Sequence, residues 1–175
     1  PRPINHYGNV KLCIENTIRT FNYQAHTKIL IARISNPYGP GQDFNKGVGF
    51  IDAAIKKAML GDVLEIWGNG DTVRDYIYID DVCEMLYSLI DYSGDEEVFN
   101  ISSGIGTSQN DIINIVEDKI RKINIVYKDR RSVDVNKIIL DNSKISNICD
   151  IKLISLENGI EKTIDHLKKY QNIWK

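Results

Sequence analysis

The fold class follows from the stretch Lys28-Ile-Leu-Ile-Ala-Arg-Ile34 and from the residues behind it, Asn36-Pro-Tyr-Gly-Pro-Gly41. The first part is short, almost continuously apolar and rich in β-branched residues, which is typical of a parallel strand that is buried on both faces. The glycines and prolines of the second part predict a loop. Because ligands of open α/β sheets bind where such strands end, we expect a binding site at this loop.

Helix and strand patterns alternate on both sides of this strand. Side chains that can cap a helix stand where three of the helices would begin: Asn5, Asp80 or Asp81, and Ser108. Gly61 stands where a helix would end. The apolar periodicity predicts helices over residues 6–24, 47–60, 80–92, 108–120, 143–149 and 156–170, and short strands over 63–67, 76–79, 98–102 and 124–127. This alternation predicts an α/β fold.

The composition is that of an ordinary globular protein of 175 residues, with 42% hydrophobic residues and a net charge of −2. This charge indicates no general attraction to nucleic acid or to an anionic membrane, and no apolar run approaches the roughly 18 residues of a membrane span. The chain starts without Met and without a signal peptide, so we expect a cytoplasmic protein and a fragment of a longer one. The three cysteines and three histidines lack metal-ligand spacing, so we expect no metal.

Tyr7 and Lys11 are four residues apart in the first predicted helix, so their side chains share one face. A phenol has an ordinary pKa of about 10 and is a poor base at neutral pH. A nearby ammonium and a cationic nicotinamide ring can stabilise the phenolate in a partly dehydrated site. The pair alone equally fits an exposed tyrosine beside a solvated lysine.

A second group of candidate residues surrounds the glycine-rich turn after the strand over residues 63–67. Arg74 follows this turn, where an arginine can bind a phosphate through two parallel hydrogen bonds. The alternative for Arg74 is a surface ion pair with Asp75. Trp67 and Tyr76 flank the same turn, and one interpretation of both is packing in the core.

Four motifs follow one another along the chain: Tyr7-Gly-x-x-Lys11, Arg33-x-x-Asn-Pro-Tyr-Gly-Pro-Gly41, Gly68-x-Gly-x-x-x-Arg-Asp-Tyr-Ile-Tyr-Ile-Asp-Asp81 and Phe99-Asn-Ile-Ser-Ser-Gly104. Their order and spacing resemble the extended short-chain dehydrogenase/reductase family of NAD-dependent epimerases and dehydratases. Within it, the chain is most similar to the UDP-glucose 4-epimerases. The resemblance covers nearly the whole chain, but only the carboxyl-terminal half of the family's pattern.

The resemblance implies the end of a Rossmann-type parallel sheet domain plus a smaller α/β substrate-binding domain. Residues 1–46 would hold the last helix and strand of the dinucleotide-binding domain. Residues 47–175 would form the nucleotide-sugar-binding domain, with some segments returning to the first. The family's glycine-rich cofactor loop and catalytic Ser/Thr would precede this chain, which implies that the chain alone is inactive.

The resemblance also implies roles for single residues. Tyr7 matches the general base and acid, and Lys11 matches the residue that activates it and binds the nicotinamide ribose, so both would also contact the cofactor NAD. By the same match, the substrate diphosphate would be contacted by Asn36, Arg74 and Arg131, with Arg130 as an alternative to Arg131. The nucleotide would be contacted by Val48, Trp67 and Tyr76.

The implied reaction is C4 epimerisation of a UDP-sugar through a transient 4-keto intermediate, serving polysaccharide precursor synthesis. The implied assembly is a homodimer through the apolar face around Val10, Ile14 and Phe21, although this face could instead pack on the rest of the sheet. The alternative reactions are those of a nucleotide-sugar 4,6-dehydratase or another nucleotide-sugar oxidoreductase. An alternative of another class is a non-catalytic nucleotide-binding module.

Overall fold

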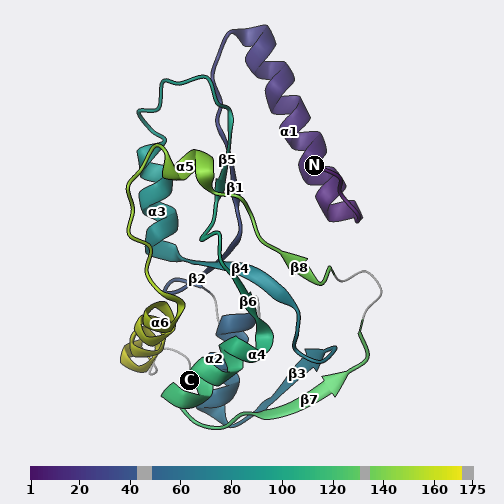
Figure 1. Ribbon diagram of the computed structural model, residues 1–175, viewed down its shortest axis with the longest axis vertical. Coiled ribbons are helices and arrows are strands. Elements are labelled where there is room, and N and C mark those ends of the chain that lie inside the picture. The colour runs from purple at the N-terminus through teal and green to yellow at the C-terminus, as the bar shows by residue number, and fades with distance from the viewer. Residues whose placement is uncertain (43–48, 131–134, 171–175) are drawn as a thin grey trace.

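The computed structural model of the chain describes residues 1–42, 49–130 and 135–170 (Figure 1). Helices and parallel strands are mixed, so the predicted α/β class is confirmed. We divide the molecule into an upper part around the strand pair β1–β5, a central strand β4 with its partners, and a lower part around the strand pair β3–β7. Within the described ranges, none of the helices is long and apolar enough to cross a membrane.

The upper part is built on two parallel strands, β1 (Ile31–Ile34) and β5 (Val98–Ile101). The helices α1 (His6–Ala25), α3 (Ile79–Ser88) and α5 (Ser143–Ser146) accompany them. Side chains from β4, β5, α5 and the helix α3 with its C-cap form a small core with members Ile77, Val82, Met85, Leu89, Phe99, Ile101 and Ile145.

The central strand β4 (Val73–Tyr78) pairs with three short strands from distant parts of the chain. β2 (Asn36–Tyr38) and β8 (Lys137–Ile138) run parallel to it, and β6 (Gly106–Ser108) runs antiparallel. Since β2 directly follows β1, the pairing of β2 with β4 places β4 at the carboxyl end of β1.

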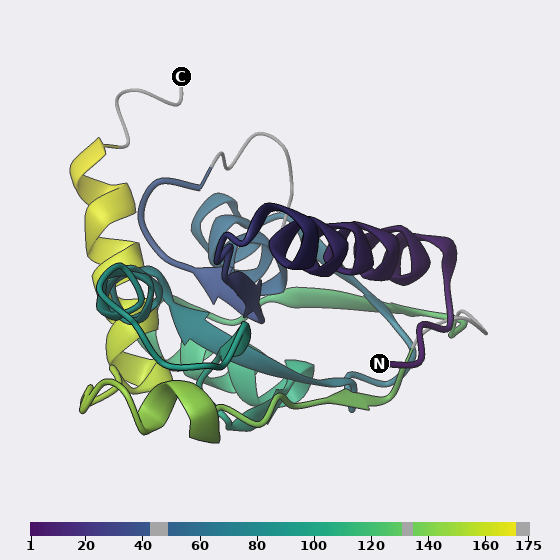
Figure 2. The same ribbon diagram turned by 90° about the horizontal axis from the view of Figure 1, so that it is seen from above.

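The lower part combines the parallel strands β3 (Val63–Trp67) and β7 (Asn124–Lys128) with three helices. These helices are α2 (Phe50–Leu60), α4 (Gln109–Lys119) and α6 (Leu156–Tyr170). Its core is the larger of the two and includes Ile51, Ala54, Ile55, Leu64, Ile66, Ile112, Val116, Ile160 and Ile164. Seen from above, α6 and α1 lie on opposite sides of the molecule (Figure 2).

Local signals placed several helix ends correctly. Asn5 caps α1, since its Oδ1 accepts a hydrogen bond from Gly8 N at 2.8 Å. Ser108 begins α4 in a capping box with Asp111. Gly61 ends α2 in the left-handed conformation, with φ of 77°.

Two predictions around β4 were wrong. The stretch from Asn36 was expected to be entirely loop, but Asn36–Tyr38 forms β2, because an edge strand tolerates a proline that donates no backbone hydrogen bond. Neither Asp80 nor Asp81 caps α3, which follows β4 directly with Tyr78 at the N-cap position. Asp81 instead accepts a hydrogen bond from Ile154 N at 3.0 Å.

The expected burial of β1 on both faces is also wrong for this chain. Ile31 is buried, but Ile34 keeps 43% of its surface exposed. Among the described residues, β1 pairs with β5 alone, and Ala32 and Ile34 are both exposed, so one face of the strand stays open.

Candidate functional site

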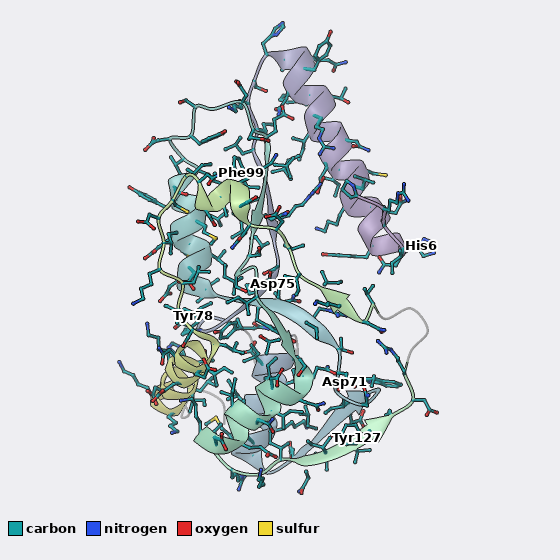
Figure 3. All side chains as sticks on the ribbon, viewed as in Figure 1. His6, Asp71, Asp75, Tyr78, Phe99 and Tyr127 are labelled. Carbon is teal, nitrogen blue, oxygen red and sulfur yellow. The ribbon has the colours of Figure 1, made fainter. Side chains whose placement is uncertain are left out.

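The first turn of α1 carries Tyr7, and Lys11 follows one turn later on the same face, as predicted. The Lys11 ammonium lies 5.4 Å from the centroid of the Tyr7 ring. Tyr7 keeps 73% of its surface exposed, so its hydroxyl is accessible to a ligand. In Figure 3, His6 marks this turn at the end of α1 that is nearer to the lower part of the molecule.

Polar contacts fix α1 to the strand pair of the upper part. Arg33 on β1 donates to both carboxylate oxygens of Glu15, at 2.7 and 2.5 Å. The hydrogen bonds from Arg33 hold the pKa of Glu15 below its ordinary value. Asn22 donates to Ile29 O at 3.0 Å and to Glu97 Oε1 at 3.1 Å, and its Oδ1 accepts from Ile29 N at 2.9 Å. The helix with Tyr7 is therefore held by charged and amide groups.

Asn36, Arg74 and Tyr76 come together at the carboxyl end of β1. Asn36 and Tyr76 are direct register partners of β2 and β4. Arg74 and Tyr76 are two residues apart on one strand, so all three belong to the same sheet face. Asn36 donates from Nδ2 to Asp75 O at 2.8 Å. The second Nδ2 hydrogen remains a candidate donor to an anionic ligand.

Arg74 and Tyr76 differ in what they offer a ligand. Arg74 is half-buried, and its Nη1 donates to Val73 O at 2.9 Å, which still leaves guanidinium donors for an anion. Burial raises the pKa of Tyr76 to about 12, an effect that the Arg74 charge opposes. The Tyr76 ring packs against the core of the lower part, as the alternative of core packing predicts, and its phenol is a neutral hydrogen-bonding group at physiological pH.

The suggested ion pair between Arg74 and Asp75 is not formed. Neighbouring residues of a strand point to opposite faces, and Asp75 is fully buried, with 0% of its surface exposed. Its carboxylate accepts hydrogen bonds from Ser35, Ser103, Gly104 and Leu140 instead. Sequence reasoning missed this role. Strand alternation gave a signal for it, because an acidic residue between two residues that face a site points to the opposite face and needs hydrogen-bond donors there.

Trp67 lies at the end of β3, away from the core. Leu64 and Ile66 point inward, whereas Trp67 is 39% exposed, so the alternative of a core tryptophan is wrong. The Lys128 ammonium lies 5.6 Å from the centroid of the indole ring. Arg130 packs beside the turn after Trp67. A Cβ atom added to Gly68 in this turn would lie 3.9 Å from the Cβ atom of Arg130. This end of the β3–β7 pair thus combines an aromatic ring with two cations.

The expected site residues therefore fall into three groups. Tyr7 and Lys11 lie on α1, and Asn36, Arg74 and Tyr76 surround β4. Trp67 lies at the end of β3, with Arg130 nearby. Val48 and Arg131 lie outside the described residues. Within the described ranges, no three His, Cys, Asp or Glu side chains gather as a metal site.

The fold and these motifs are those of Rossmann-type enzymes of the short-chain dehydrogenase/reductase class. The sequence model described as "NAD dependent epimerase/dehydratase family" matches residues 1–102. This range is more than half of the chain, and the chain belongs to that family.

Three relatives illustrate the range of the family. The dTDP-4-dehydro-6-deoxyglucose reductase of Escherichia coli is 30% identical over 164 residues, which are 93% of this chain and 52% of the reductase. The Thermotoga maritima UDP-glucose 4-epimerase structure with UDP-glucose is 33% identical, with a TM-score of 0.89 over 98% of this chain and 56% of that one. The Bacillus cereus UDP-glucuronic acid 4-epimerase structure with UDP-glucuronic acid and NAD is 26% identical, with a TM-score of 0.87 over 97% and 54%.

These relatives act on nucleotide sugars but catalyse different reactions, so family membership alone does not select one reaction. The chain spans about half of the length of each of these relatives.

Proposed function

We propose that this chain forms the nucleotide-sugar-binding half, with the Tyr/Lys helix, of an NAD-dependent UDP-hexose 4-epimerase. In this proposal, residues 1–46 belong to the dinucleotide-binding domain and residues 47–175 to the substrate domain. The main supporting observation is that Asn36, Arg74 and Tyr76, from two motifs far apart in sequence, meet on one sheet face at the carboxyl end of β1. That is the position where α/β sheets bind ligands.

The substrate diphosphate is the part of the ligand that this face would bind. Arg74 would form charge-assisted hydrogen bonds with it, and Asn36 would donate the second hydrogen of its Nδ2 to it. Arg131, or Arg130 beside it, would supply a second cation. Trp67 would stack on the base, as an exposed aromatic ring can, while Tyr76 would bind the ribose and Val48 would contact the nucleotide. Binding energy would then come from groups remote from the reacting carbon, which leaves the sugar free to turn.

Tyr7 and Lys11 would act on the sugar and on the nicotinamide end of the cofactor. Their exposed phenol and ammonium form a donor set that suits a sugar hydroxyl and a ribose hydroxyl. Tyr7 would take the proton from the sugar 4-hydroxyl and later return it. NAD, when bound, supplies the hydride acceptor for the sugar carbon.

The binding part of the proposal is tested by calorimetry of UDP with the 175-residue chain. We expect Arg74→Ala to weaken UDP binding by at least about tenfold, because a charge-assisted contact with phosphate is lost. Arg19→Ala on α1 is the matched control and should leave the dissociation constant unchanged. Equal affinity of wild type and Arg74→Ala would contradict the proposed site.

The catalytic part is tested in the full-length protein that carries this chain, with NAD and either UDP-glucose or UDP-N-acetylglucosamine. We expect C4-inverted product, and we expect Tyr7→Phe to reduce turnover by about 10²–10⁴-fold without weakening UDP-sugar binding. Tyr23→Phe, on the same helix, is the control. Near-normal turnover of Tyr7→Phe would remove Tyr7 from the mechanism.

A second candidate is a nucleotide-sugar reductase, which the likeness to the Escherichia coli reductase favours. The same assay separates the candidates. An epimerase inverts C4 without net consumption of a reduced cofactor, a reductase consumes one, and a 4,6-dehydratase yields a 4-keto-6-deoxy sugar. Binding of UDP without any turnover would indicate a non-catalytic nucleotide-binding module.

We also propose that the full-length protein is a cytoplasmic homodimer that supplies precursors of polysaccharides. The apolar side chains of Val10, Ile14 and Phe21 on α1 are 57%, 48% and 50% exposed, which would suit a second copy of the helix. The cysteines Cys13, Cys83 and Cys149 are free, as is usual in a reducing compartment. Light scattering tests the dimer, and a monomer at micromolar concentration would contradict it.

A further inference from the structure

Asp75 lies at the centre of the molecule, where β4 runs between the upper and lower parts (Figure 3). Its Oδ1 accepts hydrogen bonds from Ser103 N at 2.9 Å, Ser103 Oγ at 2.8 Å and Ser35 Oγ at 3.3 Å. Its Oδ2 accepts from Gly104 N at 3.1 Å and Leu140 N at 3.3 Å. One fully buried carboxylate thus serves as the acceptor for five hydrogen bonds.

These donors belong to three separate segments of the chain. Ser35 lies between β1 and β2 and immediately precedes Asn36. Ser103 and Gly104 form the turn between β5 and β6. Leu140 follows β8, the strand that pairs with Val73 and Arg74. The carboxylate therefore fixes the positions of these segments relative to one another and to β4.

The same residue also supports the candidate diphosphate contacts. The backbone carbonyl of Asp75 accepts the Asn36 amide, while its side chain binds Ser35, so Asn36 is oriented from two sides. Arg74 and Tyr76 flank Asp75 in β4 and lie on the opposite sheet face, so anchoring Asp75 also fixes these two residues. Asp75 itself points away from their face and would not touch a ligand.

We infer that Asp75 is a positioning residue for recognition of the nucleotide diphosphate, acting through Asn36 and Arg74. This inference rests on the proposed function, because it assigns a support to the same site. All five groups around the carboxylate are donors, so the position requires an acceptor on both oxygens. An asparagine would place its NH₂ group against at least one backbone N–H, leaving a buried donor without a partner.

The inference is tested by UDP calorimetry of three variants, with thermal melts of each. We expect Asp75→Asn to weaken UDP binding by about tenfold or more, because displaced Ser35 and Ser103 segments shift Asn36 and Arg74. Asp75→Glu keeps two acceptor oxygens and should recover part of the affinity. Ser35→Ala removes only the longer of the two hydrogen bonds that serine hydroxyls donate to Asp75. It should weaken UDP binding about threefold while the melting temperature stays near that of wild type.

Val82→Ala, in the upper core, is the control for a purely structural effect. It should lower the melting temperature by about 5 °C while leaving the UDP dissociation constant of the folded chain unchanged. If UDP binds and Arg74→Ala weakens it, but Asp75→Asn and Ser35→Ala bind like wild type, the positioning role is overturned and the proposed function stands. If Asp75→Asn does not fold, Ser35→Ala decides the question. A wild-type chain without affinity for UDP would overturn both.

Discussion

The helices α1 and α2 belong to the same chain but are held in place by different forces. The described side chains of α1, a helix of 20 residues, include a single buried one, the polar Asn22. The 11-residue helix α2 buries five residues, four of them apolar, in the core of the lower part. α1 is thus attached by hydrogen bonds and an ion pair, whereas α2 is attached by the hydrophobic effect.

This difference separates the two proposed tasks of the protein. The lower part, which carries Trp67 of the proposed nucleotide contacts, contains its own core and gains stability from it. The helix with Tyr7 and Lys11 presents apolar side chains to solvent and depends on few contacts within this chain. Nucleotide binding and proton transfer are therefore expected to respond very differently to mutation.

The largest expected effect concerns the burial of the two helices. Ile55 on α2 is 0% exposed, and Ile14 on α1 is 48% exposed. We expect Ile55→Ala to reduce the free energy of unfolding by about 2–5 kcal/mol, because it leaves a cavity. Ile14→Ala should change it by less than about 0.5 kcal/mol. Urea unfolding of both variants measures this difference, and similar losses would remove the contrast between the helices.

The next effect concerns an unusual acid in the first turn of α2. Asp52 is buried, and neither carboxylate oxygen has a hydrogen-bond partner among the described residues. Burial raises the pKa of Asp52 to about 7 from an ordinary 3.8. Because the folded-state pKa is the higher one, the stability that depends on the protonated acid is fully present below about pH 4. It is lost as the pH rises toward 7.

We therefore expect the free energy of unfolding of the wild-type chain to fall by about 1–3 kcal/mol between pH 4 and pH 8, after allowance for solvent relaxation around the acid. Asp52→Asn cannot ionise and should lose this part of the pH dependence. Denaturation at several pH values tests it. Parallel pH profiles for wild type and Asp52→Asn would show that Asp52 ionises freely in the folded state.

The smallest effect concerns the attachment of α1. We expect Asn22→Ala to remove about 1–2 kcal/mol of local stability, because Ile29 and Glu97 lose their amide partner. Amide hydrogen exchange should then accelerate in α1 and remain unchanged in α4. Gln24→Ala, an exposed change on the same helix, is the control. Faster exchange in both helices would mean that the upper and lower parts unfold as one unit.

Sequence reasoning succeeded where structure depends on neighbouring residues. The caps at Asn5 and Ser108 and the end of α2 at Gly61 are formed by groups within a few residues of each helix end. Such contacts can be inferred from residue type and spacing alone. The shared helix face of Tyr7 and Lys11 likewise follows from their spacing alone.

Sequence reasoning failed where a feature depends on a distant segment. β2, β6 and β8 have three residues or fewer, and each exists because it pairs with β4. The role of Asp75 was missed for the same reason. Strand alternation indicates that Asp75 and Arg74 face opposite ways, but only the tertiary arrangement places Ser103 and Leu140 against the carboxylate.

The pairing of β4 has a consequence for how the polypeptide is made. Its partners stretch from Asn36–Tyr38 to Lys137–Ile138, so the sheet is dominated by non-local pairs that are slow to form. On the ribosome, β4 emerges well before β8 and Leu140 do. The Asp75 carboxylate therefore acquires its last hydrogen-bond donor only after Leu140 has been translated, and the ligand-binding face can mature only after that point.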